Sequence, residues 1–197
     1  MPLDARFAAL RQRLNQSPGL RLDLAGATLR ESAVLVPLFL RGGEPHLVFT
    51  RRPESLRRHG GQISFPGGAR DLDDLSAMET ALREAHEELG LAPAQVEVLG
   101  TLNETPTNTS FRIQPFVGVI PGDVVYRPSL EEIDEVIEAP LRALVDPSIY
   151  RVESVRVQGT DHDVHYYQHG PHLIWGATAR ILRDLLEVSS TLELPLW

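Results

Sequence analysis

Apolar residues along this chain follow two kinds of pattern, one typical of strands and the other of helices. Residues 33–40 and 46–51 are apolar runs rich in β-branched and aromatic side chains, and the Gly-Gly-Glu-Pro segment between them predicts a hairpin. Similar runs predict five more strands, at residues 96–102, 111–120, 133–137, 152–157 and 164–169. The last two runs flank the turn at residues 159–161, so they predict a second hairpin.

Three segments carry apolar residues at helical spacing. The first is an N-terminal helix over about residues 4–15. The second follows a capping box at residues 76–79 and ends at Gly90, and its apolar stripe is predicted to face the core through Met78, Leu82, Ala85 and Leu89. The third spans about residues 175–188. Residues 52–75 show neither pattern and are predicted to form one long loop, which in a compact domain is normally functional.

Length and pattern together predict a single α/β domain over residues 1–197, with a mixed β-sheet between helices. The chain contains no Cys, so it offers neither a disulfide framework nor a thiolate zinc site. Its net charge of −8 argues against a surface that coats nucleic acid. Because no apolar run approaches a membrane span and the N-terminus lacks a signal-peptide order, we expect a cytoplasmic protein with no membrane partner. The sequence leaves the oligomeric state open, with a homodimer as one option.

Residues 83–91 read Arg-Glu-Ala-His-Glu-Glu-Leu-Gly-Leu and place three carboxylates on the second predicted helix. Positions i, i+3 and i+4 share one helix face, so Glu84, Glu87 and Glu88 are expected to project together. Three adjacent anions repel one another unless a cation lies among them, and oxygen ligands without Cys favour Mg²⁺ or Mn²⁺ over Zn²⁺. A solvated acidic helix face is the alternative interpretation of these glutamates.

A cluster of arginines lies just upstream, around a Gly-Gly turn. The chain has Arg but no Lys, and the planar fork of Arg grips a phosphate through two hydrogen bonds. We expect substrate contacts from this segment, at Arg51, Arg52, Arg57, Arg58, His59, Gly67 and Gly68. Ordinary surface pairing with Glu54 and Asp71 is the alternative for individual arginines, and His59 could equally brace the loop.

Together these two segments resemble the Nudix hydrolases, and within them the coenzyme A pyrophosphatase branch. The family's box ends in Arg-Glu-apolar-x-Glu-Glu-x-Gly-apolar, which the chain matches in full from Arg83 to residue 91. Upstream of Arg83 the chain departs from the spacing of the family box. The position at which the box has its first Glu, counted from Gly68, holds Asp74, and Arg83 lies one residue further along the chain than the box places its Arg. The departure weakens a role for Asp74 but resembles the longer loop of this branch. The branch's upstream pattern is met by Thr50, Arg52, Arg57, Gly61 and Phe65 to Gly68.

The resemblance implies a Nudix-type α/β/α sandwich. It also implies metal-dependent hydrolysis of coenzyme A or its thioesters, giving 3′,5′-ADP and 4′-phosphopantetheine or its acylated form. Two alternatives stay open: a Nudix hydrolase of another nucleoside diphosphate derivative, such as ADP-ribose, or a non-catalytic nucleotide-binding module. An intact glutamate triad argues against the module, because an anionic cluster is costly to keep.

Hydrolysis of a pyrophosphate needs an aligned water and cations that neutralise the phosphoryl oxygens. Glu84 and Glu88 are the expected principal metal ligands, and Gly68 could add its backbone carbonyl because no side chain blocks it. Glu87 is expected to be a third ligand or the water-orienting base. The resemblance implies that Arg83 braces a catalytic glutamate rather than touching substrate. It also implies that the base can come from a later loop, where the sequence offers Glu104, Glu131, Glu132 and Glu135.

Histidines outside this segment are a weaker signal. A zinc site made of His162, His165, His169 and His172 is not expected, because their spacing matches no standard ligand pattern and they straddle the second hairpin. Solvated or substrate-facing side chains are the preferred interpretation. His86, inside the acidic segment, is expected to face solvent.

Overall fold

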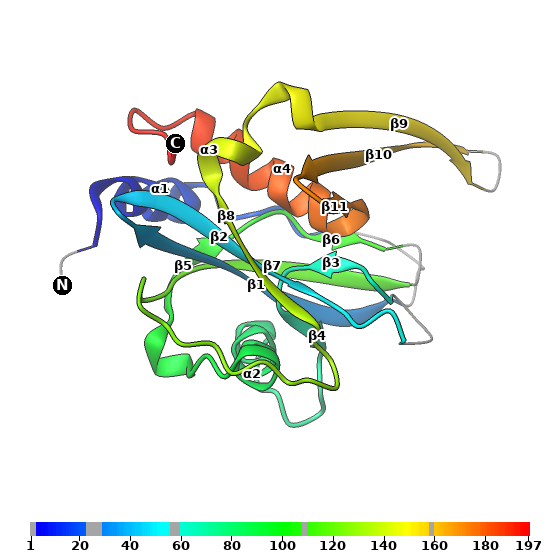
Figure 1. Cartoon of the computed structure of the whole chain (residues 1–197), viewed down its shortest axis with the longest axis horizontal. Helices are drawn as coiled ribbons and strands as arrows, with labels where there is room; N and C mark the ends of the chain where they lie inside the picture. Colours follow the sequence, from blue (N-terminus) through cyan, green and yellow to red (C-terminus); the bar gives the residue numbers. More distant parts are fainter. Residues whose placement is uncertain (1–2, 23–28, 56–59, 108–109, 158–159) are drawn as a thin grey trace.

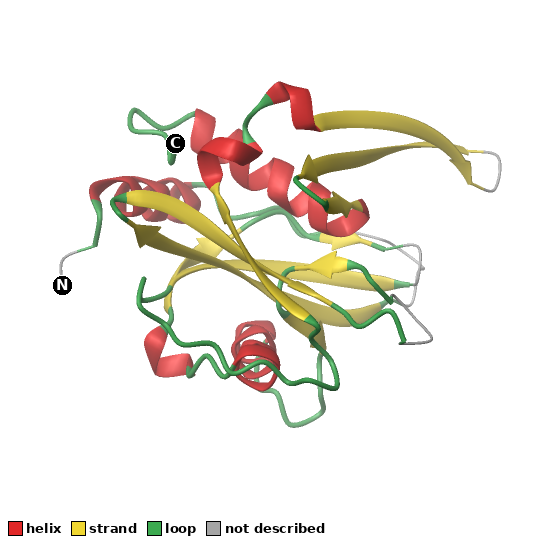
Figure 2. Ribbon diagram, viewed as in Figure 1, coloured by secondary structure: helices red, strands yellow, loops and turns green. Residues whose placement is uncertain are grey.

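The computed structural model describes residues 3–22, 29–55, 60–107, 110–157 and 160–197. Within these residues, an eight-stranded mixed sheet lies between helix α2 (Ala77–Leu89) on one face and helices α1 (Ala5–Gln16) and α4 (Gly176–Ser190) on the other (Figure 1). A second, three-stranded sheet packs beside α4 (Figure 2). The predicted fold class, an α/β/α sandwich with a mixed sheet between helices, is confirmed.

The central sheet is organised around β1 (Arg30–Arg41), which is buried on both faces from Ala33 to Phe39. β1 pairs antiparallel with β2 (Glu44–Arg51) through the predicted hairpin, and parallel with β7 (Phe111–Val119). Burial on both faces explains why β1 is a continuous apolar run instead of an alternating one. The other strands of this sheet are β3 (Ile63–Ser64), β4 (Gly67–Ala69), β5 (Glu97–Thr101), β6 (Thr105–Pro106) and β8 (Glu135–Pro140).

Helix α2 begins and ends at its sequence signals. The Ser76 side chain accepts a hydrogen bond from the backbone N–H of Glu79, and Gly90 ends the helix with a φ of 70°. The buried face consists of Thr80, Ala81, Ala85, Glu88 and Leu89. Its alanines let the helix pack closely against β1, so α2 is held firmly over one face of the sheet.

The larger core lies on the opposite face, where α1 and α4 cover the sheet. α1 contributes Phe7, Leu10 and Leu14, and α4 contributes Ala179, Ile181, Leu182 and Leu185. The remaining helical turns are α3 (Leu141–Leu144), η1 (Pro93–Gln95) and η2 (Pro147–Ile149). Among the described residues, no helix is both long enough and apolar enough to cross a membrane.

The smaller sheet consists of β9 (Tyr150–Val157), β10 (Thr160–His169) and β11 (His172–Trp175), all antiparallel. β9 and β10 confirm the second predicted hairpin. At its base this sheet joins the larger core through Tyr167 and Ile174, while the far half of the hairpin projects away from the body (Figure 1).

Several expected elements differ from the structure. The single loop predicted over residues 52–75 is wrong, because β3 and β4 lie within it. Such short strands carry no periodicity, and β4 exists through its pairing with residues 32–34 of β1. The strand expected at residues 133–137 lies instead at Glu135–Pro140, and the sequence pattern does not predict β6, β11 or α3. Met78 is 42% exposed instead of facing the core, because α2 turns its alanines toward β1.

Candidate metal and substrate site

Two glutamates of α2 face the short strand β4. A Cβ added at Gly68 would overlap the Glu84 carboxylate, and the Gly67 N–H donates a hydrogen bond to Glu88 Oε2 at 3.3 Å. Glycines at these positions therefore allow the backbone of β4 to approach the acidic side chains. The close approach also covers them, so that Glu88 is only 2% exposed.

Burial makes the negative charge of this pair unfavourable. It raises the pKa of Glu88 to about 8, an effect that the charge of Arg52 opposes and that of Glu84 reinforces. Burial also raises the pKa of Glu84, and here the charge of Arg83 is the main opposing effect. A cation bound between the two carboxylates would favour their ionised forms.

Arg83 ties α2 to the loop that precedes it. Its Nε lies 3.0 Å from Asp74 Oδ1, and its Nη atoms lie 3.0 Å from Glu84 and 2.9 Å from Glu87. Asp74 is 6% exposed, and the hydrogen bond from Arg83 is the main reason that its pKa falls to about 2. Asp74 also accepts a hydrogen bond from Thr80 Oγ1 at 2.8 Å, so it fixes Arg83 against Glu84.

The buried position of Asp74 was not predicted, because the spacing of the box weakened the case for a role of this residue. The one available signal was its position, where the family box has Glu. The spacing mismatch obscured this signal, because the longer loop changes the distance to Arg83 along the chain and not the contact in space.

Glu87 lies at the rim of the acidic pair. Its side chain is 56% exposed and contacts Arg83, whereas Glu84 and Glu88 face β4. Across the described ranges, no three or more Asp, Glu and His side chains are gathered as a ready cation site. The structure therefore brings two of the three predicted glutamates together, beside the Gly68 backbone.

Of the arginines expected to bind substrate, Arg51 and Arg52 are described, and their surroundings differ. Arg51 lies 2.6 Å from Asp134 and 3.0 Å from Glu135, so its charge holds the start of β8. Arg52 forms no ion pair with a described residue, its Nε is buried without a hydrogen-bond partner there, and its charge acts on Glu88. The Arg51 Nε is likewise buried without a hydrogen-bond partner, but Arg51 already has two ion pairs, so Arg52 is the better placed of the two for an anionic substrate. The predicted contacts at residues 57–59, Arg57, Arg58 and His59, lie outside the described residues.

Glu132 is the candidate base whose charge acts on both members of the acidic pair, since it raises the pKa of Glu84 and of Glu88. It belongs to the segment that leads into β8. This segment is held against the end of α2 by two backbone hydrogen bonds, from Arg127 to Leu89 at 2.8 Å and from Ser129 to Glu88 at 3.0 Å. Glu132 is itself exposed, so its carboxylate is free to face a substrate.

The other candidate bases are less suitably placed. Glu135 is engaged by Arg51 and by His172, the latter at 3.4 Å. Glu104 is buried and accepts a hydrogen bond from the Leu22 N–H at 2.7 Å. Glu131 is exposed beside Glu132, but its charge is not among the main influences on the acidic pair.

Among the described residues the histidines of the smaller sheet form no group of three or more, although His169 lies opposite His172 in the pairing of β10 with β11. His165 is 8% exposed and hydrogen-bonded to Tyr150 at 2.9 Å, His172 contacts Glu135, and His162 is exposed on the hairpin. His86 is exposed on α2, as expected.

The residues around Gly68 fit a hard divalent cation. They supply the buried carboxylate of Glu88, the partly buried carboxylate of Glu84 and a backbone carbonyl, with no thiol. The Gly68 carbonyl already accepts a hydrogen bond from Ser32 Oγ at 2.7 Å and keeps a second lone pair. Mg²⁺ or Mn²⁺ would be held here by Glu84, Glu88 and the Gly68 carbonyl, with Glu87 close to the rim.

Comparison with known proteins identifies relatives along most of the chain. The family model for the NUDIX domain matches residues 29–167. The "Uncharacterized Nudix hydrolase NudL" of Enterobacter sp. (strain 638) is 43% identical over 158 residues, which cover 79% of this chain and 81% of that protein. The protein of the same name from Escherichia coli (strain K12) is 38% identical over 181 residues, covering 92% and 90%.

Solved structures share the fold. A MutT/nudix family protein from Enterococcus faecalis superposes with a TM-score of 0.52 at 13% identity, covering 96% of this chain and 72% of its own. The Nudix hydrolase RenU from M. smegmatis gives a TM-score of 0.50 at 22% identity, covering 59% and 74%. At these identities the likeness concerns the fold alone.

Proposed function

This chain belongs to the Nudix hydrolase family, and we propose that it hydrolyses the pyrophosphate bond of coenzyme A or an acyl-coenzyme A with the help of Mg²⁺ or Mn²⁺. The products would be 3′,5′-ADP and 4′-phosphopantetheine or its acylated form. One observation carries the catalytic part of the proposal: Glu88 is buried beside the half-buried Glu84, and the charge of Arg52, whose buried Nε has no hydrogen-bond partner among the described residues, acts on Glu88. A pyrophosphate that binds together with its metal ion needs both carboxylates to hold the cation and a guanidinium with a free donor to bind a phosphate oxygen.

The proposed roles follow from the position of each side chain. When bound, the cation would neutralise the charge that spreads over the phosphoryl oxygens. Glu132 accepts a proton from the water whose oxygen attacks one phosphorus, while the bridging P–O bond breaks and its electron pair leaves with the other phosphate. Arg52 donates hydrogen bonds to a substrate phosphate. Arg83, fixed by Asp74, holds the rotamer of Glu84 without touching substrate.

The choice of coenzyme A rests on the sequence pattern upstream of the box. Residues 50–68 match the pattern of the coenzyme A branch at Thr50, Arg52, Gly61 and the Phe-Pro-Gly-Gly segment. The same stretch of residues also contains Arg57 and Arg58. Coenzyme A differs from ADP-ribose in its 3′-phosphate, a dianion that a guanidinium can hold through two parallel hydrogen bonds. A net gain of about 1.4 kcal/mol from this contact corresponds to a tenfold preference.

The test is a comparison of kcat/KM for coenzyme A, its 3′-dephospho form and ADP-ribose. We expect coenzyme A to exceed both by about tenfold or more, and Arg57→Ala to narrow the first difference. Arg156→Ala, an exposed arginine on the projecting hairpin, is the matched control and should leave both ratios unchanged. Equal hydrolysis of the 3′-dephospho form would contradict the phosphate contact, and a preference for ADP-ribose would contradict the proposed substrate.

A further inference from the structure

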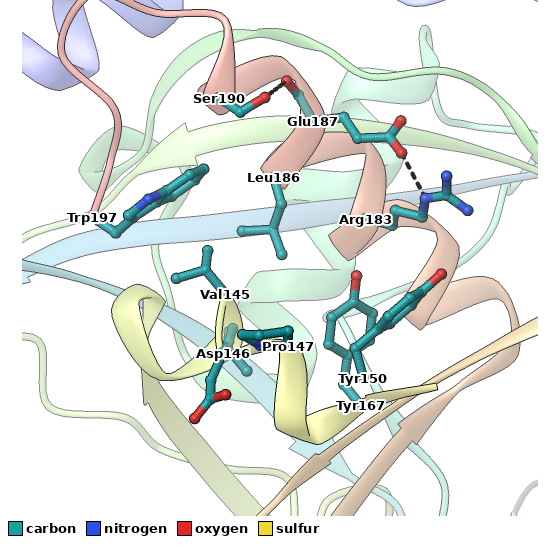
Figure 3. Close-up of a pocket in the computed structure, with 11 residues that line it drawn as sticks. Val145, Asp146, Pro147, Tyr150, Tyr167, Arg183, Leu186, Glu187, Ser190 and Trp197 are labelled. Atoms are coloured by element: carbon teal, nitrogen blue, oxygen red, sulfur yellow. Dashed lines mark hydrogen bonds and ion pairs between the residues drawn. The ribbon is translucent and has the colours of Figure 1, made fainter. Parts of the chain in front are cut away.

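A cavity lies on the face of the sheet opposite α2. It is open to solvent over much of its surface, has a volume of about 360 Å³ and is bounded by α4, the end of α3, η2 and the base of the β9–β10 hairpin (Figure 3). Its tyrosines and leucines belong to the core on the α4 side, whereas α2 packs on the other core. The sheet therefore separates this cavity from Glu84 and Glu88.

One end of the cavity is apolar. It is lined by Val145 and Pro147, where α3 leads into η2, by Leu186 of α4 and by Trp197. Figure 3 shows Leu186 between Trp197 and the two tyrosines. Trp197 is still 42% exposed, so this end presents apolar surface that an apolar ligand would bury.

The other end gathers hydrogen-bond donors. Figure 3 shows the hydroxyl groups of Tyr150 and Tyr167 directed toward α4, on the side of Arg183. In the part of the chain that the structure describes, the Tyr167 hydroxyl has no hydrogen-bond partner. Burial raises the pKa of Tyr167 to about 12, so the hydroxyl keeps its proton at neutral pH. Tyr150 is hydrogen-bonded to His165 at 2.9 Å.

Arg183 supplies a cation at this end that is only partly neutralised. Its Nε contacts Glu187 at 2.6 Å, and its Nη1 lies 3.3 Å from His165 Nε2. Burial and the charge of Arg183 lower the pKa of His165, so the imidazole stays neutral and adds no competing cation. The second acidic lining residue, Asp146, accepts a hydrogen bond from the Ser148 N–H at 2.8 Å, and its carboxylate points away from the other lining side chains (Figure 3).

We propose that this cavity binds a small amphipathic monocarboxylate, with its apolar body against Leu186, Pro147 and Trp197 and its carboxylate on Arg183 and the Tyr167 hydroxyl. A single negative charge matches one guanidinium that is already shared with Glu187. The body can be aliphatic, as in a medium-chain fatty acid, or aromatic, as in an arylalkanoic acid. Both share the chemistry that the cavity recognises.

The test is calorimetric titration of the full chain, in metal-free buffer, with octanoate and with 3-phenylpropionate. Octylamine, which has the same chain and the opposite charge, is the comparison ligand. We expect saturable binding of at least one acid and none of the amine. Binding of only one acid identifies the body as aliphatic or aromatic, and either result supports the site.

Substitutions of the lining residues test which side chains bind the carboxylate. Arg183→Gln should weaken acid binding by about tenfold, the value of one charge-assisted hydrogen bond. Glu187→Gln should strengthen binding, because it removes the anion that competes for Arg183, an effect that a purely structural role would not produce. Tyr167→Phe should also weaken binding and serves if Arg183→Gln does not fold. Arg41→Gln is the matched control, because Arg41 likewise pairs with one glutamate, Glu138, away from the cavity.

Three outcomes would overturn the proposal. The first is no binding of either acid at millimolar concentration. The second is unchanged affinity in Arg183→Gln and Tyr167→Phe, with thermal melts showing both folded. The third is loss of binding in Glu84→Gln, since that would place the acid at the catalytic carboxylates on the other side of the sheet.

Discussion

At the scale of single residues, Asp74 is the side chain on which the orientation of Arg83 depends. It is buried, and among the described residues it is the one that accepts a hydrogen bond from the Arg83 Nε. We predict that Asp74→Asn lowers the free energy of unfolding by about 2 kcal/mol, the range for a buried hydrogen bond to a charged group. Urea denaturation at neutral pH measures this difference.

The matched control is Asp71→Asn, because Asp71 lies in the same loop, 3.8 Å from Arg83, with 71% of its side chain exposed. Loss of the Asp71 carboxylate should lower the free energy of unfolding by less than about 0.5 kcal/mol.

The contribution of Asp74 to the free energy of unfolding should depend on pH. The native pKa of Asp74 is lowered to about 2, so its contribution is complete above the ordinary carboxyl pKa and disappears as the pH falls toward 2. If the free energies of unfolding of the native protein and Asp74→Asn differed by the same amount throughout that pH interval, the proposed role of the Asp74 carboxylate would be wrong.

The glycine pair of β4 gives a second prediction, in which two neighbouring substitutions have different effects. A Cβ at Gly68 would meet only the mobile end of the Glu84 side chain, so Gly68→Ala should displace that carboxylate and lower kcat by about a hundredfold with little loss of stability. A Cβ at Gly67 would lie 2.7 Å from the Val34 Cα, a backbone atom that cannot move aside. Gly67→Ala should therefore lower the free energy of unfolding by about 1–3 kcal/mol. Thermal melts and rate measurements on both variants separate the effect on stability from the effect on kcat. If the two variants lost the same stability and the same kcat, the predicted difference between Gly67 and Gly68 would be wrong.

Residue spacing alone could not predict the burial of this site. Helical periodicity correctly places Glu84 and Glu88 on one face, but the same rule gives Glu87 an equal part. The difference arises in three dimensions, because β4 covers Glu88 while Arg83 holds Glu87 at the rim. Arg51 and Arg52 are likewise adjacent in the sequence and differ only through the carboxylates that lie near each.

At the scale of elements, long periodic segments were predictable and short ones were not. The capping box and Gly90 delimit α2 correctly, and the apolar runs predict β1, β2, β7, β9 and β10. β3 and β4 were missed because their two or three residues have no pattern of their own and depend on pairing with β1 and β2. β3 and β4 belong to the segment that forms one wall of the site. In this segment the sequence therefore predicted the residues that bind ligands but not the strands that hold them.

The segment that joins β7 to β8 carries the third prediction. Because its backbone is hydrogen-bonded to the end of α2, Glu132 has a defined position relative to the acidic pair. We predict that Glu132→Gln lowers kcat by about a hundredfold or more, as expected for a general base, with little change in KM. The neighbouring Glu131→Gln should stay within about twofold of the native rate. Equal effects of the two substitutions would show that only the total charge of the segment matters.

At the scale of the whole molecule, the buried acidic pair should couple cation binding to folding. A ligand that binds only the native state stabilises it by RT ln(1 + [L]/Kd), about 2.7 kcal/mol at a hundredfold excess over Kd. We predict that Mg²⁺ or Mn²⁺ raises the Tm of the native chain. Glu84→Gln and Glu88→Gln should remove this rise, whereas Glu153→Gln on the exposed hairpin should retain it. A full rise in both site variants would place the cation elsewhere.

We propose that this Nudix hydrolase cleaves coenzyme A at its pyrophosphate with the help of a cation bound at the Glu84 and Glu88 carboxylates. The most direct measurement is mass spectrometry of the products after incubation of coenzyme A with the native chain and with Glu88→Gln, each with Mg²⁺ and with chelator. We predict that 3′,5′-ADP and 4′-phosphopantetheine form only in the sample of the native chain with Mg²⁺. Intact coenzyme A in that sample, or the same products from the chelated or Glu88→Gln samples at the native rate, would contradict it.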